Sequence, residues 1–202
     1  MKAAAATIAA AALTTADRRQ PLDVQWVATP HDVASVALEW AAVGAGDLMI
    51  ELGCGDGRVA MAAARRGARA ICVERDLELA AEARALIDSN GLSDRVDVQT
   101  VDMFEANVTE ITVAFLFLLP ELNARLRRDM LSRAPRLRAV VSHRFEVYGW
   151  PCGERIRVDD ALFLKWEAPF AAAAAGELNE DDEAAAIVEH ALDCGVAEDV
   201  GD

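Results

Sequence analysis

Residues 47–76 read DLMIELGCGDGRVAMAAARRGARAICVERD. This stretch begins as an apolar strand, passes through three glycines within five residues, and resumes as an alanine-rich helix that leads into a second apolar strand. Glycines at a strand-to-helix turn let the main chain approach a ligand closely, and the first turn of the helix presents N–H groups that have no helical partner. The stretch therefore predicts a strand, turn, helix and strand that bind a nucleotide-like ligand at the turn.

Strands and helices continue to alternate along the chain. Apolar or alternating runs predict seven strands in the segments DLMIEL, RAICVE, RVDVQTV, TVAFLFL, LRAVVSH, RIRV and ALFLKWE. Helices are expected over residues 30–42, with Thr29 as the cap, over 58–66, from Asp76, and from Pro120. This order predicts an α/β fold with a doubly wound, Rossmann-like seven-stranded sheet, mostly parallel with a C-terminal antiparallel hairpin.

The negative charge is concentrated near the C-terminus. The 202 residues carry a net charge of −14, and residues 171–202 hold ten acidic residues and no Lys or Arg. We expect an Ala-rich leader over residues 1–20, one globular domain over 21–170, and an acidic tail over 171–202. A short helix is expected in the tail from the spacing of Ala184, Ile187, Val188 and Leu192.

Composition also bears on compartment and partners. The leader, MKAAAATIAAAALTTADRR, is compatible with a signal-like segment or with a weak helix. No run approaches the roughly 20 strongly apolar residues of a membrane span, so no transmembrane segment is expected. A pI near 4.6 argues against general nucleic-acid binding. The four cysteines contain no C-x-x-C pair, so we expect neither a metal site nor a disulfide framework, and we expect a reducing, cytoplasmic location.

Three acids follow successive strands around the glycine turn. Glu51 precedes the turn, and Glu74 and Asp102 come at the ends of the second and third strands. Such carboxylates can accept hydrogen bonds from an amine, a ribose and an adenine amino group, which are the donors of S-adenosylmethionine, whereas they would repel a pyrophosphate. The alternating glycines also differ from the G-x-G-x-x-G of dinucleotide binders. We therefore expect S-adenosylmethionine as cofactor, the alternative being glycines that only pack a strand against a helix.

The segments ELGCGDGRVA, ICVERD and VDMFEA resemble the cofactor motifs of class I S-adenosylmethionine-dependent methyltransferases. WVATPHDV, FLFLLPELNARLR and VVSHRFEVYGW resemble bacterial relatives of the ATP-synthase c-subunit lysine methyltransferase family, over residues 24–167. Two residues depart from that family: Glu74 stands where many relatives have Asp, and Arg144 stands where they often have an acid. The resemblance implies cofactor contacts from Thr29, Glu51, Gly53, Gly55, Asp56, Gly57, Glu74, Asp102 and Met103.

The methyl acceptor is expected beyond the fourth strand. Pro120 and Glu121 follow that strand, and His143 ends the fifth strand, where a structural and a functional role are equally compatible with the sequence. These three residues are the candidate catalytic residues. The resemblance implies methylation of a protein lysine, and two alternatives stay open: a small-molecule methyl acceptor, or a protein that binds the cofactor without turnover. The acceptor atom and the oligomeric state do not follow from the sequence.

Other conspicuous residues have simpler interpretations. Trp150 is expected to anchor a loop, and Cys54 to fill space within the glycine turn. A set of arginines after the fourth strand predicts a solvated helix face or a surface that meets an acidic partner. They are Arg125, Arg127, Arg128 and Arg133.

Overall fold

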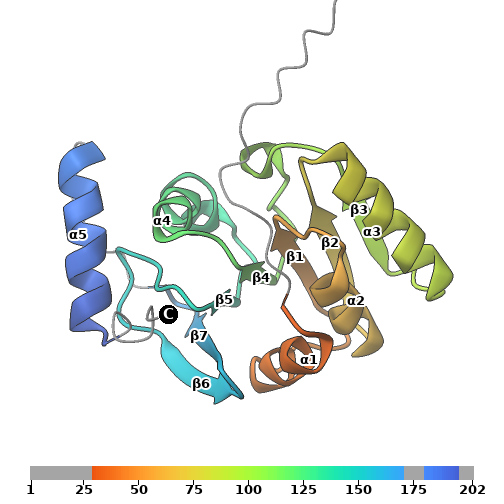
Figure 1. Cartoon of the computed structure of the whole chain (residues 1–202), viewed down its shortest axis with the longest axis horizontal. Helices are drawn as coiled ribbons and strands as arrows, with labels where there is room; N and C mark the ends of the chain where they lie inside the picture. Colours follow the sequence, from red (N-terminus) through yellow and green to blue (C-terminus); the bar gives the residue numbers. More distant parts are fainter. Residues whose placement is uncertain (1–28, 171–179, 196–202) are drawn as a thin grey trace, which may run out of the picture.

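The computed structural model describes residues 29–170 and 180–195. Its centre is a seven-stranded sheet in the order β3-β2-β1-β4-β5-β7-β6 (Figure 1). Strands β1 to β5 are parallel, and β7 pairs antiparallel with β5 and β6. The predicted fold and its C-terminal hairpin are confirmed. The strands are β1 Leu48–Leu52, β2 Arg69–Val73, β3 Val96–Gln99, β4 Val113–Leu116, β5 Ala139–His143, β6 Glu154–Val158 and β7 Ala161–Glu167.

Helices cover both faces of this sheet. Buried residues of the first three helices pack with Met49 and Phe115 on one face, and Leu126 of α4 packs with Ile50 and Leu116 on the other. Adjacent strand residues such as Met49 and Ile50 therefore serve opposite cores, which explains why the central strands are apolar throughout. The helices are α1 His31–Trp40, α2 Arg58–Arg65, α3 Leu77–Ser89, α4 Pro120–Asp129 and α5 Glu180–Asp193, with short 3-10 helices η1 Met103–Glu105 and η2 Leu131–Arg133.

The strand order reverses between β1 and β4. From β1 the chain moves outward to β2 and β3, and then returns to place β4 on the other side of β1. Ligands of doubly wound sheets lie at such a reversal, beyond the carboxyl ends of the strands. The glycine turn directly follows β1, so the fold brings it to this position.

The start of α1 differs from the prediction. Pro30 occupies the cap position and makes no capping hydrogen bond through its side chain, whereas Thr29 was expected to be the cap. The Thr29 hydroxyl lies instead 3.0 Å from Nδ1 of His143. A tertiary contact has therefore replaced the local one that the sequence suggested.

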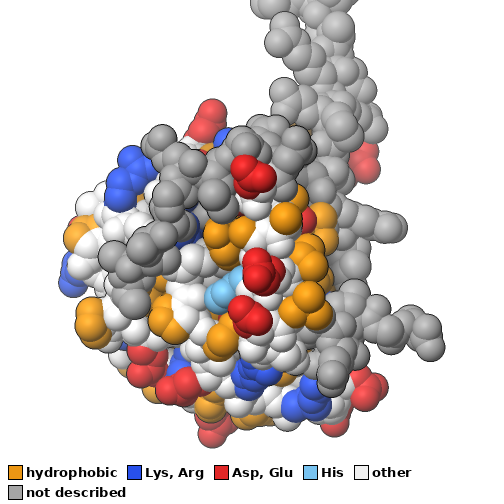
Figure 2. Space-filling view, turned by 90° about the vertical axis from the view of Figure 1, so that its left-hand side faces the viewer, with side chains coloured by type: hydrophobic (Ala, Val, Ile, Leu, Met, Phe, Trp, Pro, Cys, Tyr) orange, Lys and Arg blue, Asp and Glu red, His pale blue; other side chains and the backbone are white. Residues whose placement is uncertain are grey.

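The predicted helix in the tail is present as α5, which lies at the opposite end of the molecule from α3 (Figure 1). Only part of its predicted apolar face is buried: Ile187 is 4% exposed, whereas Val188 and Leu192 are each 59% exposed. Figure 2 views the molecule from the α5 side and shows acidic and hydrophobic side chains mixed there. Glu183 of α5 accepts a 2.7 Å hydrogen bond from Arg128, so one arginine of this set meets an acid of the tail, whereas Arg125 pairs with Asp129 of α4 itself.

The cysteines overturn the expectation of no disulfides. Cys54 is bonded to Cys72, and Cys152 is bonded to Cys194. The members of each pair are 18 and 42 residues apart, and only the sheet topology and the docking of α5 bring them together. Within the described residues no helix is long and apolar enough to cross a membrane. The predicted leader lies outside the described residues.

Candidate active site

The glycine turn has an unusual backbone. Gly53, Gly55 and Gly57 have φ values of 76°, 55° and 76°, in the left-handed region that other residues rarely adopt. A Cβ atom at Gly53 would lie 3.2 Å from Cδ2 of Leu118 and 3.9 Å from Cε of Met103. The turn therefore faces the segments that follow β3 and β4, as a cofactor site at the strand reversal requires.

Glu74 joins the turn to the end of β2. One carboxylate oxygen accepts a 2.9 Å hydrogen bond from the N–H of Gly55, and the other accepts one of 2.9 Å from the N–H of Asp76. The Cys54–Cys72 disulfide links the same turn to β2 a second time, so Cys54 does more than fill space. Each oxygen of Glu74 keeps lone-pair capacity for a further donor, which suits the hydroxyls of a ribose.

Glu51 supplies a second buried carboxylate. It is 6% exposed and accepts a 2.8 Å hydrogen bond from the N–H of Ala60 in the first turns of α2. Burial raises the pKa of Glu51 well above its ordinary value, and the negative charges of Asp56 and Glu74 raise it further. A cationic ligand placed among these three acids would reverse that effect, because it favours the ionised carboxylate.

Asp56 is bound by a neighbour that the sequence reasoning passed over. Its carboxylate accepts 2.9 Å and 3.1 Å hydrogen bonds from Nε of Arg58, and the guanidinium also donates a 3.4 Å bond to the carbonyl of Thr29. The predicted contacts Thr29 and Asp56 are thereby brought together through Arg58. The D-G-R order within the turn was the available signal, since an acid two residues before an arginine at a helix start can pair with it.

Asp102 and Met103 reach the same region from β3. Asp102 caps η1 by accepting a 2.9 Å hydrogen bond from the N–H of Phe104, and its second oxygen lies 3.9 Å from a guanidinium nitrogen of Arg75. The side chain of Met103 faces Gly53 together with that of Leu118. An acid beside a thioether across from the glycine turn forms a surface on which a purine could lie.

The predicted acceptor residues lie at the ends of β4 and β5. Pro120 is the first residue of α4, and Glu121 is exposed in its first turn. Phe117, which directly follows β4, packs against the imidazole of His143 with ring centroids 3.9 Å apart. The β4–α4 segment therefore connects the glycine turn, through Leu118, to His143.

His143 is held on several sides. It is 7% exposed and hydrogen-bonded to Thr29, and its ring stacks on that of Phe163 with centroids 4.6 Å apart. Burial, followed by the charge of Arg144, lowers the pKa of His143 to about 4, so that its imidazole is neutral at neutral pH. These contacts give His143 a structural task, whether or not it also meets the methyl acceptor.

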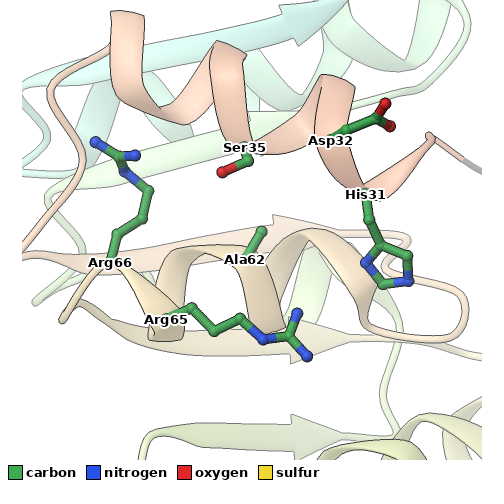
Figure 3. A pocket seen from close by; sticks show the side chains of 6 residues that line it. All are labelled: His31, Asp32, Ser35, Ala62, Arg65 and Arg66. Atoms are coloured by element: carbon green, nitrogen blue, oxygen red, sulfur yellow. The ribbon is translucent and has the colours of Figure 1, made fainter.

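A separate hollow of about 540 Å³ lies between α1 and α2 (Figure 3). No residue predicted to bind cofactor or acceptor lines it, and it is therefore distinct from the glycine-turn site. The hollow is lined by His31, Asp32, Ser35, Ala62, Arg65 and Arg66.

Trp150 is the loop anchor that the sequence predicts. Its side chain is 4% exposed and stacks on Phe170 with ring centroids 4.8 Å apart.

Comparison with known proteins gives a consistent result. The chain is 37% identical over 139 residues to a protein-lysine N-methyltransferase of Saccharolobus islandicus, covering 68% of this chain and 86% of that protein. It also resembles the crystal structure of an RNA methyltransferase from Salinibacter ruber in complex with S-adenosyl-L-homocysteine, with a TM-score of 0.66 and 34% identity over 77% of this chain and 98% of that one.

The C-terminal domain of precorrin-6Y C5,15-methyltransferase from Rhodobacter capsulatus shares the fold, with a TM-score of 0.53 and 16% identity over 71% of this chain and 92% of that one. A family model, the ANTKMT methyltransferase domain, matches residues 51–154. That range contains the glycine turn, Glu51 near the end of β1, Glu74 and Asp102 after β2 and β3, and the segment after β4. The chain belongs to the ANTKMT methyltransferase family.

Proposed function

We propose that the protein transfers the methyl group of S-adenosylmethionine to a lysine side chain of another protein. The observation that carries the proposal is the glycine turn itself, in which Glu74 is hydrogen-bonded to Gly55 beside two further acids. A relative that is 37% identical is named as a protein-lysine N-methyltransferase, and this supports lysine as the acceptor. We place the catalytic domain at residues 21–170, with the tail outside it.

The residues of the turn fit the proposed cofactor. When bound, S-adenosylmethionine supplies a methyl group on a positively charged sulfonium. Glu51 and the turn glycines would hold its methionine part, Glu74 the ribose, and Asp102 with Met103 the adenine. The acids suit this ligand because both its sulfonium and its amino group are cationic. The same acids disfavour a dinucleotide, whose phosphates are anionic.

The acceptor site requires a lysine that has lost its proton, because only the free amine carries the lone pair that attacks a methyl group. Phe117 and Leu119 offer an apolar environment after β4, and desolvation lowers the pKa of a lysine amine. Glu121 follows in the first turn of α4, where its carboxylate can orient an amine that enters from solvent. The protein's contribution is thus placement and exclusion of water, not a strong acid–base pair.

RNA is the second candidate acceptor, because the Salinibacter ruber protein at 34% identity is named as an RNA methyltransferase. The net charge of −14 disfavours it, since RNA binding depends largely on basic residues that neutralise phosphates. A small-molecule acceptor is the third.

One labelling experiment separates these acceptors. The full chain is incubated with methyl-labelled S-adenosylmethionine and a lysate, and the product is divided into protease-sensitive, ribonuclease-sensitive and low-molecular-weight fractions. Label in protein, found by mass spectrometry on lysine, supports the proposal; label in RNA or in a small molecule overturns the lysine assignment. The Glu74→Ala variant is the control that should lower the label in the same fraction when the cofactor is held below saturation.

A further inference from the structure

A cluster of metal-ligating side chains lies far from the glycine turn, between α5 and the loop from β5 to β6. Glu146, His190 and Cys194 each present a ligand atom, and these atoms lie within 4.8 Å of one another. Cys152 is bonded to Cys194 and therefore brings a second sulfur to the same point. We propose that these four residues bind a zinc ion when the Cys152–Cys194 disulfide is reduced, and that the ion fastens α5 to the methyltransferase domain.

The ligand types and their number match zinc. Two thiolates, one imidazole and one carboxylate are a tetrahedral donor set for Zn²⁺, with bonds of about 2.3 Å to sulfur and about 2.0 Å to nitrogen. Such bonds place sulfur and nitrogen ligands roughly 3.6 Å apart around a shared ion. Sγ of Cys194 and Nε2 of His190 are 3.7 Å apart, so this edge of the site is already at the required spacing.

Helix α5 brings the ligand atoms of His190 and Cys194 together. His190 and Cys194 are four residues apart in α5 and its last turn, so they lie on the same face of the helix. That face is the inward one, because Cys194 is 5% exposed and Ile187, three residues before His190, is 4% exposed. Tyr148 meets the imidazole edge-on with ring centroids 5.7 Å apart, which restricts the orientation of the ring.

Glu146 completes the set from the core side. It is 4% exposed, so its carboxylate is held inside the fold next to the ligand atoms of His190 and Cys194. Its oxygens accept hydrogen bonds of 3.1 Å from the N–H of Gly153 and 3.3 Å from Arg155. Two thiolates and one carboxylate with Zn²⁺ carry a net charge of −1, and the adjacent Arg155 guanidinium balances it.

The site becomes available through a balanced redox step. A dithiol donates two electrons and two protons to the disulfide; the sulfur–sulfur bond breaks, two thiols form, and the dithiol becomes a cyclic disulfide. Zn²⁺ then displaces the two thiol protons into solvent as two zinc–sulfur bonds form. In either state a link between Cys152 and Cys194 holds α5, by a covalent bond when oxidised and through the metal when reduced.

His190 and Cys194 lie outside residues 51–154, the range matched by the family model. The inference therefore concerns a contact between α5 and the β5–β6 loop of the domain, where Glu146 and Cys152 lie. It does not depend on the acceptor of the methyl group.

The test uses the full chain, reduced with dithiothreitol, treated with a chelator and desalted without oxygen before metal is added. Reduced protein should bind one equivalent of Zn²⁺, and Co²⁺ in its place should give tetrahedral d–d bands with thiolate-to-cobalt charge transfer. Oxidised protein should give neither. Zinc should also slow amide hydrogen exchange in α5 of the reduced protein.

Cys152→Ser should abolish this zinc binding. The variant still contains Cys54 and Cys72, so a loss of binding shows that a reduced pair of cysteines elsewhere in the chain does not bind the ion. His190→Ala and Glu146→Gln keep both cysteines, so their folding can be checked through the disulfide in the oxidised state; each should weaken binding more than about tenfold. His31→Ala, which removes an exposed histidine at the start of α1, is the matched control and should bind as wild type. Reduced wild type without stoichiometric zinc, or a His190→Ala variant that binds as tightly as wild type, would overturn the proposal.

Discussion

Thr29 and His143, 114 positions apart in the chain, are joined by a 3.0 Å hydrogen bond between Oγ1 and Nδ1. The bond ties Thr29, two residues before α1, to the last residue of β5, and the imidazole packs against the rings of Phe117 and Phe163. His143 is neutral there, since its pKa falls from 6.5 to about 4. The fold therefore binds fewer protons at this position than the unfolded chain does between these two values.

The first prediction follows from the sign of that difference. The contribution of neutral His143 to the free energy of unfolding is complete above pH 6.5 and is lost progressively as the pH falls toward 4. The total loss over this range is on the order of 3 kcal/mol. Urea unfolding of wild type and of His143→Gln at a series of pH values measures this contribution. The free energy of unfolding should rise more steeply with pH between 4 and 6.5 in wild type than in the variant. His31→Gln, which removes an exposed histidine, should leave the wild-type slope unchanged; parallel curves for His143→Gln and wild type would contradict the prediction.

A second prediction compares two glycines with similar backbones. Gly53 and Gly46 have φ values of 76° and 95°, but a Cβ at Gly53 would press on Leu118 at 3.2 Å, whereas one at Gly46 meets nothing within 4 Å. Gly46→Ala should therefore cost stability of roughly 1 kcal/mol through backbone strain alone. Gly53→Ala should in addition weaken S-adenosylmethionine binding, as measured by calorimetry. Equal cofactor affinities in the two variants would mean that Gly53 serves only the fold.

The third prediction concerns the ribose. If Glu74 accepts both hydroxyls, Glu74→Ala should lower cofactor affinity by on the order of 2 to 4 kcal/mol, because two charge-assisted hydrogen bonds are lost. The variant also releases the N–H of Gly55, so the turn itself loses a contact. Glu74→Gln, which retains one acceptor oxygen, should fall between wild type and Glu74→Ala. Calorimetric affinities that do not differ among the three proteins would remove this role.

A fourth prediction uses the raised pKa of Glu51. At pH values below its ordinary pKa of 4.5, Glu51 is protonated in both the folded and unfolded states. As the pH rises further, the unfolded chain ionises first, so stability falls until the raised pKa of the fold is passed. Glu51→Gln keeps an acceptor for the N–H of Ala60 and should therefore be more stable than wild type above this window.

The same substitution should have the opposite effect on the cofactor. A cationic ligand favours ionised Glu51, so wild-type affinity should rise with pH through the titration, whereas the affinity of Glu51→Gln should be lower and should lack this rise. Thermal melting and calorimetry over one pH series measure both effects. A variant that is less stable than wild type at every pH would show that the ionised carboxylate supports the fold.

Much of this architecture followed from local sequence signals. The strands around the glycine turn are short apolar runs bounded by glycines or acids, and Asp76 caps α3 as its position suggests, accepting bonds from the N–H groups of Glu78 and Leu79. Residues such as Glu51 and Glu74 could be located because they stand at strand ends, and parallel strands carry their ends to one edge of the sheet.

Contacts between distant segments could not be predicted in this way. The role of Thr29 changed because a histidine 114 residues later competes with the helix for its hydroxyl. The disulfides depend on how β2 follows the turn and on where α5 docks, and cysteine spacing contains neither fact. The exposure of Val188 and Leu192 has the same origin, since helical periodicity defines a face without stating which neighbour covers it.

The last prediction separates the methyl acceptor from the cofactor. Glu121 is exposed in the first turn of α4, immediately after the segment that carries Phe117 and Leu118. If it orients the acceptor amine, Glu121→Ala should lower the rate of methyl transfer by on the order of a hundredfold and leave S-adenosylmethionine affinity nearly unchanged. The reason is that the proposed cofactor contacts come from the segments after β1, β2 and β3. Single-turnover transfer and calorimetry measure the two quantities on the same protein.

Glu78→Ala is the matched control for the helix itself. Glu78 is the second residue of α3, as Glu121 is of α4, and both acids are exposed and favoured by the helix dipole. Removing either should cost a similar few tenths of a kcal/mol of stability, but only Glu121→Ala should slow methyl transfer. Equal transfer rates in the two variants would assign Glu121 to the helix dipole alone. A loss of cofactor affinity as large as the loss of rate would instead place Glu121 in the cofactor site.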